Sequence, residues 1–443
     1  MARPGLLHGK PPSIDVRTRG LARNGSLHPP FCRRVFTIHN RKLAHVRILS
    51  IFGTRPEAIK MAPLVKCLEA EPGVQSLVCV TGQHQSMLQQ VLDLFGITPD
   101  YNLAAMTANQ SLNGLTSRLF AGLDDVLAEV APDRVLVHGD TATSMVAAIA
   151  AFHRRIPVGH VEAGLRTGNM FEPWPEEMNR RVVDVVADQL FAPTASSQAN
   201  LEAEALTGRV VVTGNTVIDA LRLMCARLDS DDAMRARIDA QFPFLEPAGT
   251  GRPLLLVTGH RRESFGEGFQ QICAALAALA QTGKMQIVYP VHLNPNVRGP
   301  VLATLGNAPN VHLTDPLDYP EFVRLMQRAA IVLTDSGGVQ EEAPALGKPV
   351  LVMRDVTERP EALAAGTVKL IGTDRDAIYN AVLELAVDES ARSAYARRVN
   401  PYGDGHASER IVASLVGKPF TPFGSHALPG YAHPVLAARP DAQ

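Results

Sequence analysis

Short apolar runs alternate with longer amphipathic segments along most of the chain. Val46–Phe52 is a run rich in branched residues, and a helical pattern follows it. The same order returns with the runs Arg134–Val137 and Val158–Val161, which a helical pattern from about Thr143 to Arg154 separates. Strand, loop and helix at this spacing predict a parallel sheet with helices on both of its faces.

The alternation weakens near the middle of the chain and then restarts. Residues 225–251 are charged and then rich in proline and glycine, which predicts a connection between two domains near Ile218–Leu228, followed by a peripheral helical segment. Each half contains at least five predicted strands. The predicted fold class is therefore α/β, with two Rossmann-like domains that face each other across a cleft and hold a ligand at the carboxyl ends of their strands. The later runs are Leu254–Thr258, Gln286–Val291, Val311–Leu313, Ile331–Thr334, Val350–Val352 and Val368–Ile371.

The two ends of the chain differ from this central part. Residues 1–45 contain nine lysines and arginines, a single acid (Asp15), several prolines and no apolar period. Such a segment buries too little surface to offset its ordering entropy, so it is interpreted as a disordered extension or as an overlong start. Residues 418–443 are rich in proline and glycine and are predicted to be a loose tail. The predicted domains are therefore 46–218 and 219–417.

The composition narrows the class of protein. The chain has 443 residues, of which 46% are hydrophobic and 20% charged, and its formal net charge is −1. This balance does not suggest a nucleic-acid or membrane partner. No apolar run approaches the roughly 18–20 residues that span a bilayer. The five scattered cysteines form no C-x-x-C pair, which favours a reducing cytoplasm.

Polar residues gather where the predicted strands end. Gly53-Thr54-Arg55-Pro56 follows the first strand, and its turn and helix start offer free N–H groups to a phosphate. Arg55 and Lys60 add full positive charges, although Lys60 could equally be a solvated helix residue. A G-x-G-x-x-G fingerprint is missing from this turn, so the sequence does not favour a dinucleotide.

Three acids form a second group. Asp140 and Glu162 each follow a strand, and consecutive strands of a βαβ unit tend to lie side by side. Glu176 follows in a proline-rich loop that holds the only tryptophan, Trp174. Asp140 could instead cap a helix, and Glu176 could complement a helix dipole. Three carboxylates converging on one cleft would repel one another, which favours a chemical role.

In the second half, the segment after the strand Ile331–Thr334 gives the most specific local signal. Ser336, Gly337 and Gly338 lead into a helix, so a pyrophosphate can approach the backbone and the helix N-terminus. Glu342 lies one turn further on, where its carboxylate can accept both hydroxyls of a ribose. The pattern predicts a nucleotide-diphosphate site, to which Arg359 could add charge.

His260 and His292 also follow strands of the second half. A histidine beside arginines stays neutral more readily, which suits a hydrogen-bonding or proton-relay role for His260. A packing or capping role fits both histidines equally well. The sequence contains no H-x-x-x-H or H-E-x-x-H spacing, so no metal site is predicted.

Longer motifs carry a resemblance to a known family. The chain resembles the bacterial non-hydrolysing UDP-N-acetylglucosamine 2-epimerases over roughly residues 46–417. That family has the glycosyltransferase-B architecture and converts UDP-GlcNAc to UDP-ManNAc reversibly, without NAD or a metal. The matching stretches include FGTRPEAIKMA (52–62), VLVHGDT (135–141), PVGHVEAGLRTG (157–168), PWPEEMNR (173–180), VTGNTVIDA (212–220), VTGHRRESFG (257–266), VYPVHLNPNV (288–297), TDSGGVQEEAP (334–344) and NPYGDG (400–405).

The resemblance implies roles for individual residues and a cytoplasmic homodimer that supplies surface polysaccharide precursors. It implies that UDP leaves with the C2 proton and adds back from the other face. It also implies a second UDP-GlcNAc bound as an activator, although Ser86 departs from the residue common in activated members. The implied catalytic residues are Asp140, Glu162 and Glu176, assisted by His260. The implied substrate-binding residues are Arg55, Lys60, Asp140, Glu162, His260, Leu317 (through its backbone), Phe322, Ser336, Gly337, Gly338, Glu342 and Arg359. The implied activator-site residues are Gln83, His84, Arg261 and His292.

Three other functions remain open from the sequence. A glycosyltransferase of the same fold would transfer the sugar to an acceptor. A hydrolysing epimerase would release free ManNAc together with UDP. A non-catalytic UDP-sugar sensor would bind without turnover, but a binder of an anionic ligand gains little from three carboxylates in its cleft.

Overall fold

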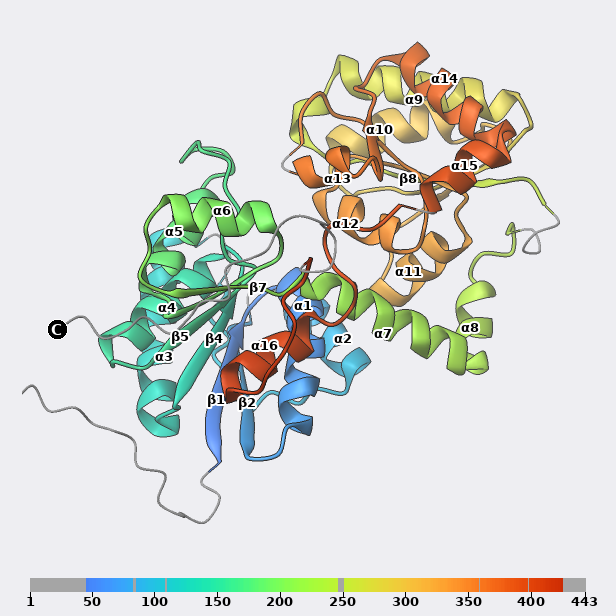
Figure 1. Ribbon diagram of the computed structural model, residues 1–443. Coiled ribbons are helices and arrows are strands. Elements are labelled where there is room, and N and C mark those ends of the chain that lie inside the picture. Colours follow the sequence, from blue (N-terminus) through green and yellow to red (C-terminus); the bar gives the residue numbers. More distant parts are fainter. Residues whose placement is uncertain are drawn as a thin grey trace, which may run out of the picture. The chain divides into compact units, whose positions relative to one another are not determined.

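The computed structural model describes residues 45–82, 85–107, 110–245, 251–357, 359–396 and 398–424. Within these residues the chain forms two β-sheets, and every strand pair in them is parallel (Figure 1). Helices cover both faces of each sheet. The predicted α/β class is therefore confirmed. We call the first sheet with its helices the first half, and the second sheet with its helices the second half.

The sheets contain seven and six strands within the described residues. The first has the order β3 (Tyr101–Asn102), β2 (Val74–Val80), β1 (Val46–Phe52), β4 (Arg134–His138), β5 (Val158–Val161), β6 (Gln189–Ala192) and β7 (Arg209–Val212). The second has the order β10 (Val311–Thr314), β9 (Gln286–Pro290), β8 (Leu254–Thr258), β11 (Ile331–Thr334), β12 (Val350–Val352) and β13 (Val368–Leu370). β3 was not predicted, because a two-residue strand at the edge of a sheet leaves no apolar run in the sequence.

Neighbouring residues of the central strands pack on opposite faces of the first sheet. In β4, Leu136 joins the core beneath one layer of helices, whereas Val135 and Val137 join the core beneath the other. This explains why the strand is apolar throughout, as expected for a sheet buried on both sides. One layer contains α1 (Arg55–Ala70), α2 (Gln85–Phe95) and α16 (Ala407–Val416); the other contains α3 (Leu112–Val130), α4 (Ala142–His153), α5 (Glu176–Val186) and α6 (Ala195–Ala203).

The second sheet is built in the same way. In β8, Leu255 and Val257 face one core and Leu256 faces the other. One layer contains α9 (Glu267–Gln281), α10 (Pro295–Leu305) and α14 (Arg375–Val387). The other contains α7 (Thr216–Ser230), α8 (Asp232–Asp239), α11 (Tyr319–Arg328) and α12 (Gly337–Ala345). The remaining helices are α13 (Pro360–Ala364), α15 (Glu389–Ala396) and the 3-10 turn Arg262–Ser264.

The halves are joined twice. The predicted connection at Ile218–Leu228 lies inside α7, which packs against α1 of the first half and against α11 and α12 of the second. α16 then returns to the first half, where Ile411 and Val412 enter the core beside α1. Within the predicted tail, the amide of Phe423 donates to the carbonyl of Val212 at 3.0 Å. The domain limits at residues 218 and 417 stay predictions.

The predicted leader, apart from His45, and the predicted tail beyond residue 424 lie outside the described residues. Among the helices of the described part, none is both long and apolar enough to cross a membrane. The four cysteines of that part, Cys67, Cys79, Cys225 and Cys273, are free thiols.

Candidate functional site

The start of α1 is fixed by a reciprocal cap. The Thr54 hydroxyl accepts from the amide of Glu57 at 3.5 Å, and the Glu57 carboxylate accepts from the amides of Gly53 and Thr54 at 3.0 and 2.7 Å. This capping box satisfies two amides that the helix would otherwise leave unpaired. Arg55, the first helical residue, donates from a guanidinium nitrogen to the backbone oxygen of Leu317 at 3.1 Å. Two predicted site residues from different halves therefore meet.

A chain of buried charges joins the two halves. Lys60 forms an ion pair with Glu162 of the first half, and Arg359 forms one with Glu341 of the second. The side-chain amide of Asn215, the N-cap of α7, donates to both carboxylates, at 2.8 Å to Glu162 and 3.1 Å to Glu341. Each buried carboxylate thus has a cation and a shared amide donor, which offsets the cost of burying its charge.

Glu162 is held as an ionised carboxylate in a strained backbone conformation. Burial alone would raise its pKa, but the positive charge of Lys60 lowers the pKa far below the ordinary value. Its φ of +68° lies in the left-handed region, which a residue with a side chain rarely adopts without a reason. On the other side, the Nε2 atom of His138 lies 3.7 Å from the carboxylate, and burial lowers the pKa of His138 to about 3. Neutral histidine and ionised glutamate thus lie side by side.

Asp140 follows β4, next to β5 and Glu162, as predicted from the order of the strands. Its carboxylate forms an ion pair with Arg180, and its backbone oxygen accepts from the Asn179 side chain at 2.9 Å. Arg180 and Asn179 both belong to α5, whose first residue is Glu176. The structure therefore brings the helix that carries Glu176 to the loop that carries Asp140.

The neighbouring acid Glu177 has a different role from Glu176. Glu177 is fully buried and accepts from the amide of Thr167 at 3.1 Å and from Arg181 at 3.1 Å. It therefore holds the loop before α5 in place. Glu176 is partly exposed at the helix start, so its carboxylate is the more accessible of the two.

A cavity of about 380 Å³ lies at the carboxyl end of the second sheet. Many of the residues that line it were predicted to bind the nucleotide, and one of them, Arg55, comes from the first half. The lining residues are Arg55, Thr258, Gly259, His260, Pro290, His292, Pro316, Leu317, Phe322, Ser336, Gly338, Val339 and Glu342. Of the residues predicted for catalysis or substrate binding, Lys60, Asp140, Glu162, Glu176, Gly337 and Arg359 are not part of this lining.

Two guanidinium groups approach the glycine turn at the start of α12. A Cβ atom added to Gly337 would lie 3.6 Å from a guanidinium nitrogen of Arg359 and 3.8 Å from one of Arg261. Ser336 is the N-cap residue, but its side chain makes no capping bond. Backbone donors, the positive end of a helix and two cations at one glycine form an arrangement suited to a phosphate group.

Glu342 is the acid of this cavity. It is buried and accepts from the Tyr319 hydroxyl at 3.1 Å. Burial raises the pKa of Glu342 to about 7. A carboxylate in this position can accept two hydroxyl donors when it is ionised, as predicted for a ribose.

Asp335 fixes the loop that carries His260. Its carboxylate accepts from the amides of His260 and Arg261 at 2.7 and 2.8 Å. Burial lowers the pKa of His260, and the charge of Arg261 contributes in the same direction. His260 therefore favours its neutral form, as predicted. The ring of His292 stacks on that of His260 with the ring centres 5.5 Å apart.

The predicted activator residues are only partly described. Gln83 and His84 lie outside the described residues. Arg261 lies beside Gly337, and His292 lies on the wall of the cavity of about 380 Å³. These two residues are therefore close to the candidate diphosphate site itself.

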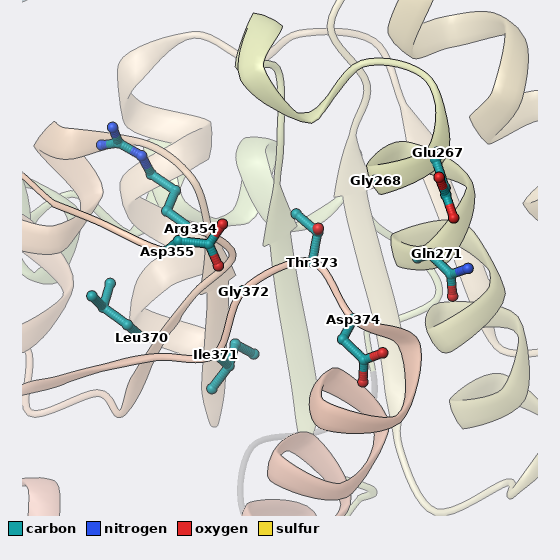
Figure 2. Close-up of a pocket in the computed structure, with 10 residues that line it drawn as sticks. All are labelled: Glu267, Gly268, Gln271, Arg354, Asp355, Leu370, Ile371, Gly372, Thr373 and Asp374. Atoms are coloured by element: carbon teal, nitrogen blue, oxygen red, sulfur yellow. The ribbon is translucent and has the colours of Figure 1, made fainter.

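A second cavity, of about 660 Å³, opens near the outer strands of the second sheet. Figure 2 shows Arg354 and Asp355 on one side of it, Glu267 and Gln271 of α9 on the other, and Thr373 between them. The guanidinium of Arg354 is bound to Glu263 at 2.5 Å. No predicted site residue lines this cavity, and its charged groups are mostly acidic.

For several residues of the site, the sequence analysis predicted no individual role. His138, Arg180, Asn215 and Glu341 all lie inside motifs that carry the resemblance. Their positions after strands or at helix starts gave a weak signal. Their partners, however, come from distant segments, so their roles depend on tertiary contacts.

Fold and site together define a class. Two parallel sheets, with a nucleotide-sized cavity at the carboxyl end of the second and acids at the carboxyl ends of β4 and β5, give an α/β enzyme of glycosyltransferase-B-like architecture. A family model described as "UDP-N-acetylglucosamine 2-epimerase" matches residues 66–416. The chain belongs to this family of isomerases.

Relatives and solved structures agree with this assignment. The UDP-N-acetylglucosamine 2-epimerase of Escherichia coli K12 is 55% identical over 372 residues, which cover 84% of this chain and 98% of the relative. A crystal structure of the Neisseria meningitidis UDP-GlcNAc 2-epimerase bound to UDP-GlcNAc has a TM-score of 0.78 and 48% identity, covering 84% of this chain and 100% of that one. The Methanocaldococcus jannaschii UDP-GlcNAc 2-epimerase in complex with UDP-GlcNAc and UDP has a TM-score of 0.69 and 30% identity, covering 84% and 99%.

Proposed function

We propose that this protein interconverts UDP-GlcNAc and UDP-ManNAc by eliminating UDP and adding it back after inversion at C2. The observation that carries the proposal is the pairing of a phosphate-type site at Gly337 with two neighbouring acids, Asp140 after β4 and Glu162 after β5. The first can hold the leaving diphosphate, and the second can exchange a proton. The UDP-GlcNAc named as bound to the Neisseria relative contains both a diphosphate and a sugar, the two parts that these two groups of residues would contact.

The C2 proton of the sugar has no neighbouring carbonyl, so its direct removal is difficult. In the proposed reaction a base takes this proton while the C1–O bond breaks, and the bonding electrons leave with the UDP oxygen. The resulting double bond between C1 and C2 is flat. The UDP oxygen then bonds to C1 again, and a proton reaches C2 from the opposite face. Two faces require two proton carriers, which explains the need for several carboxylates.

The residues divide between these tasks. Asp140, Glu162 and Glu176 are assigned to proton transfer, with neutral His260 as an assisting donor. Lys60 and Arg359 are assigned to the charge that develops on the diphosphate, together with the backbone of the glycine turn. The remaining UDP contacts are assigned to Arg55, Phe322, Ser336, Gly338 and Glu342, with the backbone of Leu317.

The test is incubation of purified protein with UDP-GlcNAc in D₂O, followed by proton NMR. UDP-ManNAc that carries deuterium at C2 is the expected product. Free ManNAc with an equal amount of UDP would instead indicate a hydrolysing epimerase. An unchanged sugar with no loss of the C2 signal, while UDP still binds, would contradict epimerisation and favour a transferase or a sensor.

Other aspects of the assignment are also proposals. A cytoplasmic location is supported by the four free thiols of the described part. A homodimer, a role in surface polysaccharide supply and activation by a second UDP-GlcNAc rest on the family resemblance. Light scattering would test the homodimer. Reverse-reaction rates with and without added UDP-GlcNAc would test the activation.

A further inference from the structure

A fully buried hydrogen-bond chain runs behind the loop that carries Asp140. His160, in β5, lies with its Nδ1 atom 2.6 Å from a carboxylate oxygen of Asp184 and with its Nε2 atom 2.8 Å from the backbone oxygen of Gly139. The His160 and Asp184 side chains have no exposed surface. Gly139 is joined to Asp140 by a peptide bond, so the chain ends at the backbone of a proposed catalytic residue.

The partners of His160 define how its ring is oriented. A carbonyl oxygen can only accept, so Nε2 must donate to Gly139. Asp184 also accepts from Arg166 at 2.8 Å and from the amide of Gly164 at 3.3 Å. Asp184 is thus held by three groups, and its contact with Nδ1 sets the direction in which Nε2 points.

The turn at Gly139 and Asp140 is held at several points, and His160 supplies the one on the peptide group between these two residues. The amide of Gly139 donates to the Val161 carbonyl at 2.9 Å, and the Asp140 carbonyl accepts from Asn179 at 2.9 Å. Gly139 has φ of +64°, and a Cβ atom there would lie 3.4 Å from the Glu162 carboxylate. The turn thus runs close to a second proposed catalytic acid, so the position of its backbone is closely constrained.

Stability alone does not account for this arrangement. A buried ion pair is often no more stabilising than well-packed apolar residues of the same volume, and it gains in directional precision instead. Here the direction is given by a ring N–H that donates to one particular carbonyl. A residue that orients a catalytic group can matter greatly, because a displacement of about 1 Å can lower a rate by roughly 100-fold.

We propose that His160, oriented by Asp184, is a positioning residue that fixes the Gly139–Asp140 peptide and thereby aims the Asp140 carboxylate at the reacting carbon of the sugar. This inference rests on the proposed role of Asp140 in proton transfer. His160 itself touches no substrate in this account.

The first test is the variant His160→Asn. Its amide nitrogen replaces Nδ1 and can still donate to Asp184, but nothing replaces Nε2 at Gly139. We expect kcat to fall roughly 10- to 100-fold. KM and the Kd for UDP should change by less than about twofold, because neither His160 nor Gly139 lines the cavity assigned to the nucleotide. An unchanged kcat, or a Kd that rises as much as kcat falls, overturns the inference.

A double variant separates positioning from simple structural support. In His160→Gln/Asp184→Asn, the glutamine amide can donate to Gly139 while its oxygen faces the new amide at position 184, whose own oxygen can still accept from Arg166. We expect it to recover most of the kcat that His160→Asn loses. The control is Asp219→Asn, which alters another buried carboxylate, one that accepts from the amides of Ala407 and Ser408 at 3.2 and 2.7 Å. It should lower Tm and leave kcat unchanged. Failure of the double variant to recover activity overturns the inference.

Two further measurements distinguish this inference from the proposed function. In spectra of protein labelled with ¹⁵N-histidine, the Nε2 atom of His160 should carry hydrogen; a bare Nε2 contradicts the proposed hydrogen bond to Gly139. Full turnover by Asp140→Asn removes Asp140 from the reaction and the inference with it. A slow Asp140→Asn beside a fully active His160→Asn leaves the proposed function intact and overturns the inference alone.

Discussion

In the second half, the candidate diphosphate site is a turn of small residues at the start of α12, with two guanidinium groups within 4 Å of a Cβ position on Gly337. In the first half, Asp140 and Glu162 are each paired with a cation, Arg180 and Lys60. The nucleotide side thus depends on backbone shape and on the smallness of its side chains. The acid side depends on balanced charges between segments far apart in the chain. Variants on the nucleotide side should therefore weaken UDP binding, whereas variants on the acid side should lower turnover or stability.

The largest expected effect is on turnover, from Asp140→Asn. The amide keeps the shape of the side chain but cannot carry a proton, so kcat should fall at least about 100-fold, the usual scale for a lost acid or base. The Kd for UDP should stay unchanged, which calorimetry can measure beside the rate. Asp188→Asn is the control, because Asp188 pairs with Arg134 at the amino end of the first sheet. Normal turnover of Asp140→Asn would falsify the assignment of proton transfer to the acid side.

The second effect is on stability, from Lys60→Met. Lys60 is the buried partner of Glu162, and burial would lower its pKa if the attraction of Glu162 and Glu341 did not raise it. Without that lysine, Glu162 remains buried without its ion-pair partner, which should cost about 3 kcal/mol of unfolding free energy. Lys66→Met on the same helix breaks a half-exposed pair with Glu69 and should cost less than about 1 kcal/mol. Urea denaturation compares the two, and equal losses would contradict the buried-charge account.

A smaller effect is expected from Gly337→Ala. The added methyl group would meet its nearest neighbours at 3.6 Å or more, so the fold should accept it. It would nevertheless occupy the space that a phosphate needs against the backbone, and we expect the Kd for UDP to rise about 10-fold. Gly299→Ala, which meets nothing within 4 Å, is the matched control. Unchanged binding by Gly337→Ala would place the diphosphate elsewhere.

The smallest effect is a change in pH dependence, from Glu342→Gln. The folded pKa of Glu342 is about 7 against 4.5 ordinarily, so between these values the folded chain holds a proton that the unfolded chain releases. Stability should therefore fall as pH rises between these values, and Glu342→Gln should lose this fall. If ionised Glu342 accepts the ribose hydroxyls as proposed, UDP affinity of the wild type should rise about threefold from about pH 6 to about pH 8. The same rise in Glu342→Gln would contradict the assignment.

The strands and the helix starts could be predicted because each leaves a local signal. Runs such as Val332–Leu333 in β11 and Val135–Val137 in β4 are apolar throughout, since their neighbouring residues pack on alternating faces of a sheet that is covered on both sides. The first helix start was also visible, because Pro56 acts within one turn of the helix. Both kinds of signal depend only on residues close together in the chain.

The short strand β3 and the return of α16 to the first half were not predicted. β3 has two residues, and its place depends on pairing with β2 rather than on its own pattern. α16 is amphipathic like any surface helix, and nothing within it says which sheet it covers. Its assignment depends on the contacts that Ile411 and Val412 make with residues of α1, far earlier in the chain.

In the candidate site, the features that depend on residues close together in the chain follow from the order of the residues. The Ser336-Gly337-Gly338 turn, the capping box before Arg55 and the acids that follow β4 and β5 each depend on neighbours along the chain, so the amino-acid sequence is enough to specify them.

The pairing of the charges, in contrast, arises only when the chain is packed. Segments that are distant in the chain are joined by Asn215 between Glu162 and Glu341, by Arg180 on Asp140, and by His160 between Asp184 and Gly139. A buried charge is stabilised by whichever groups folding brings within a few ångströms of it, and separation along the sequence does not reveal that distance.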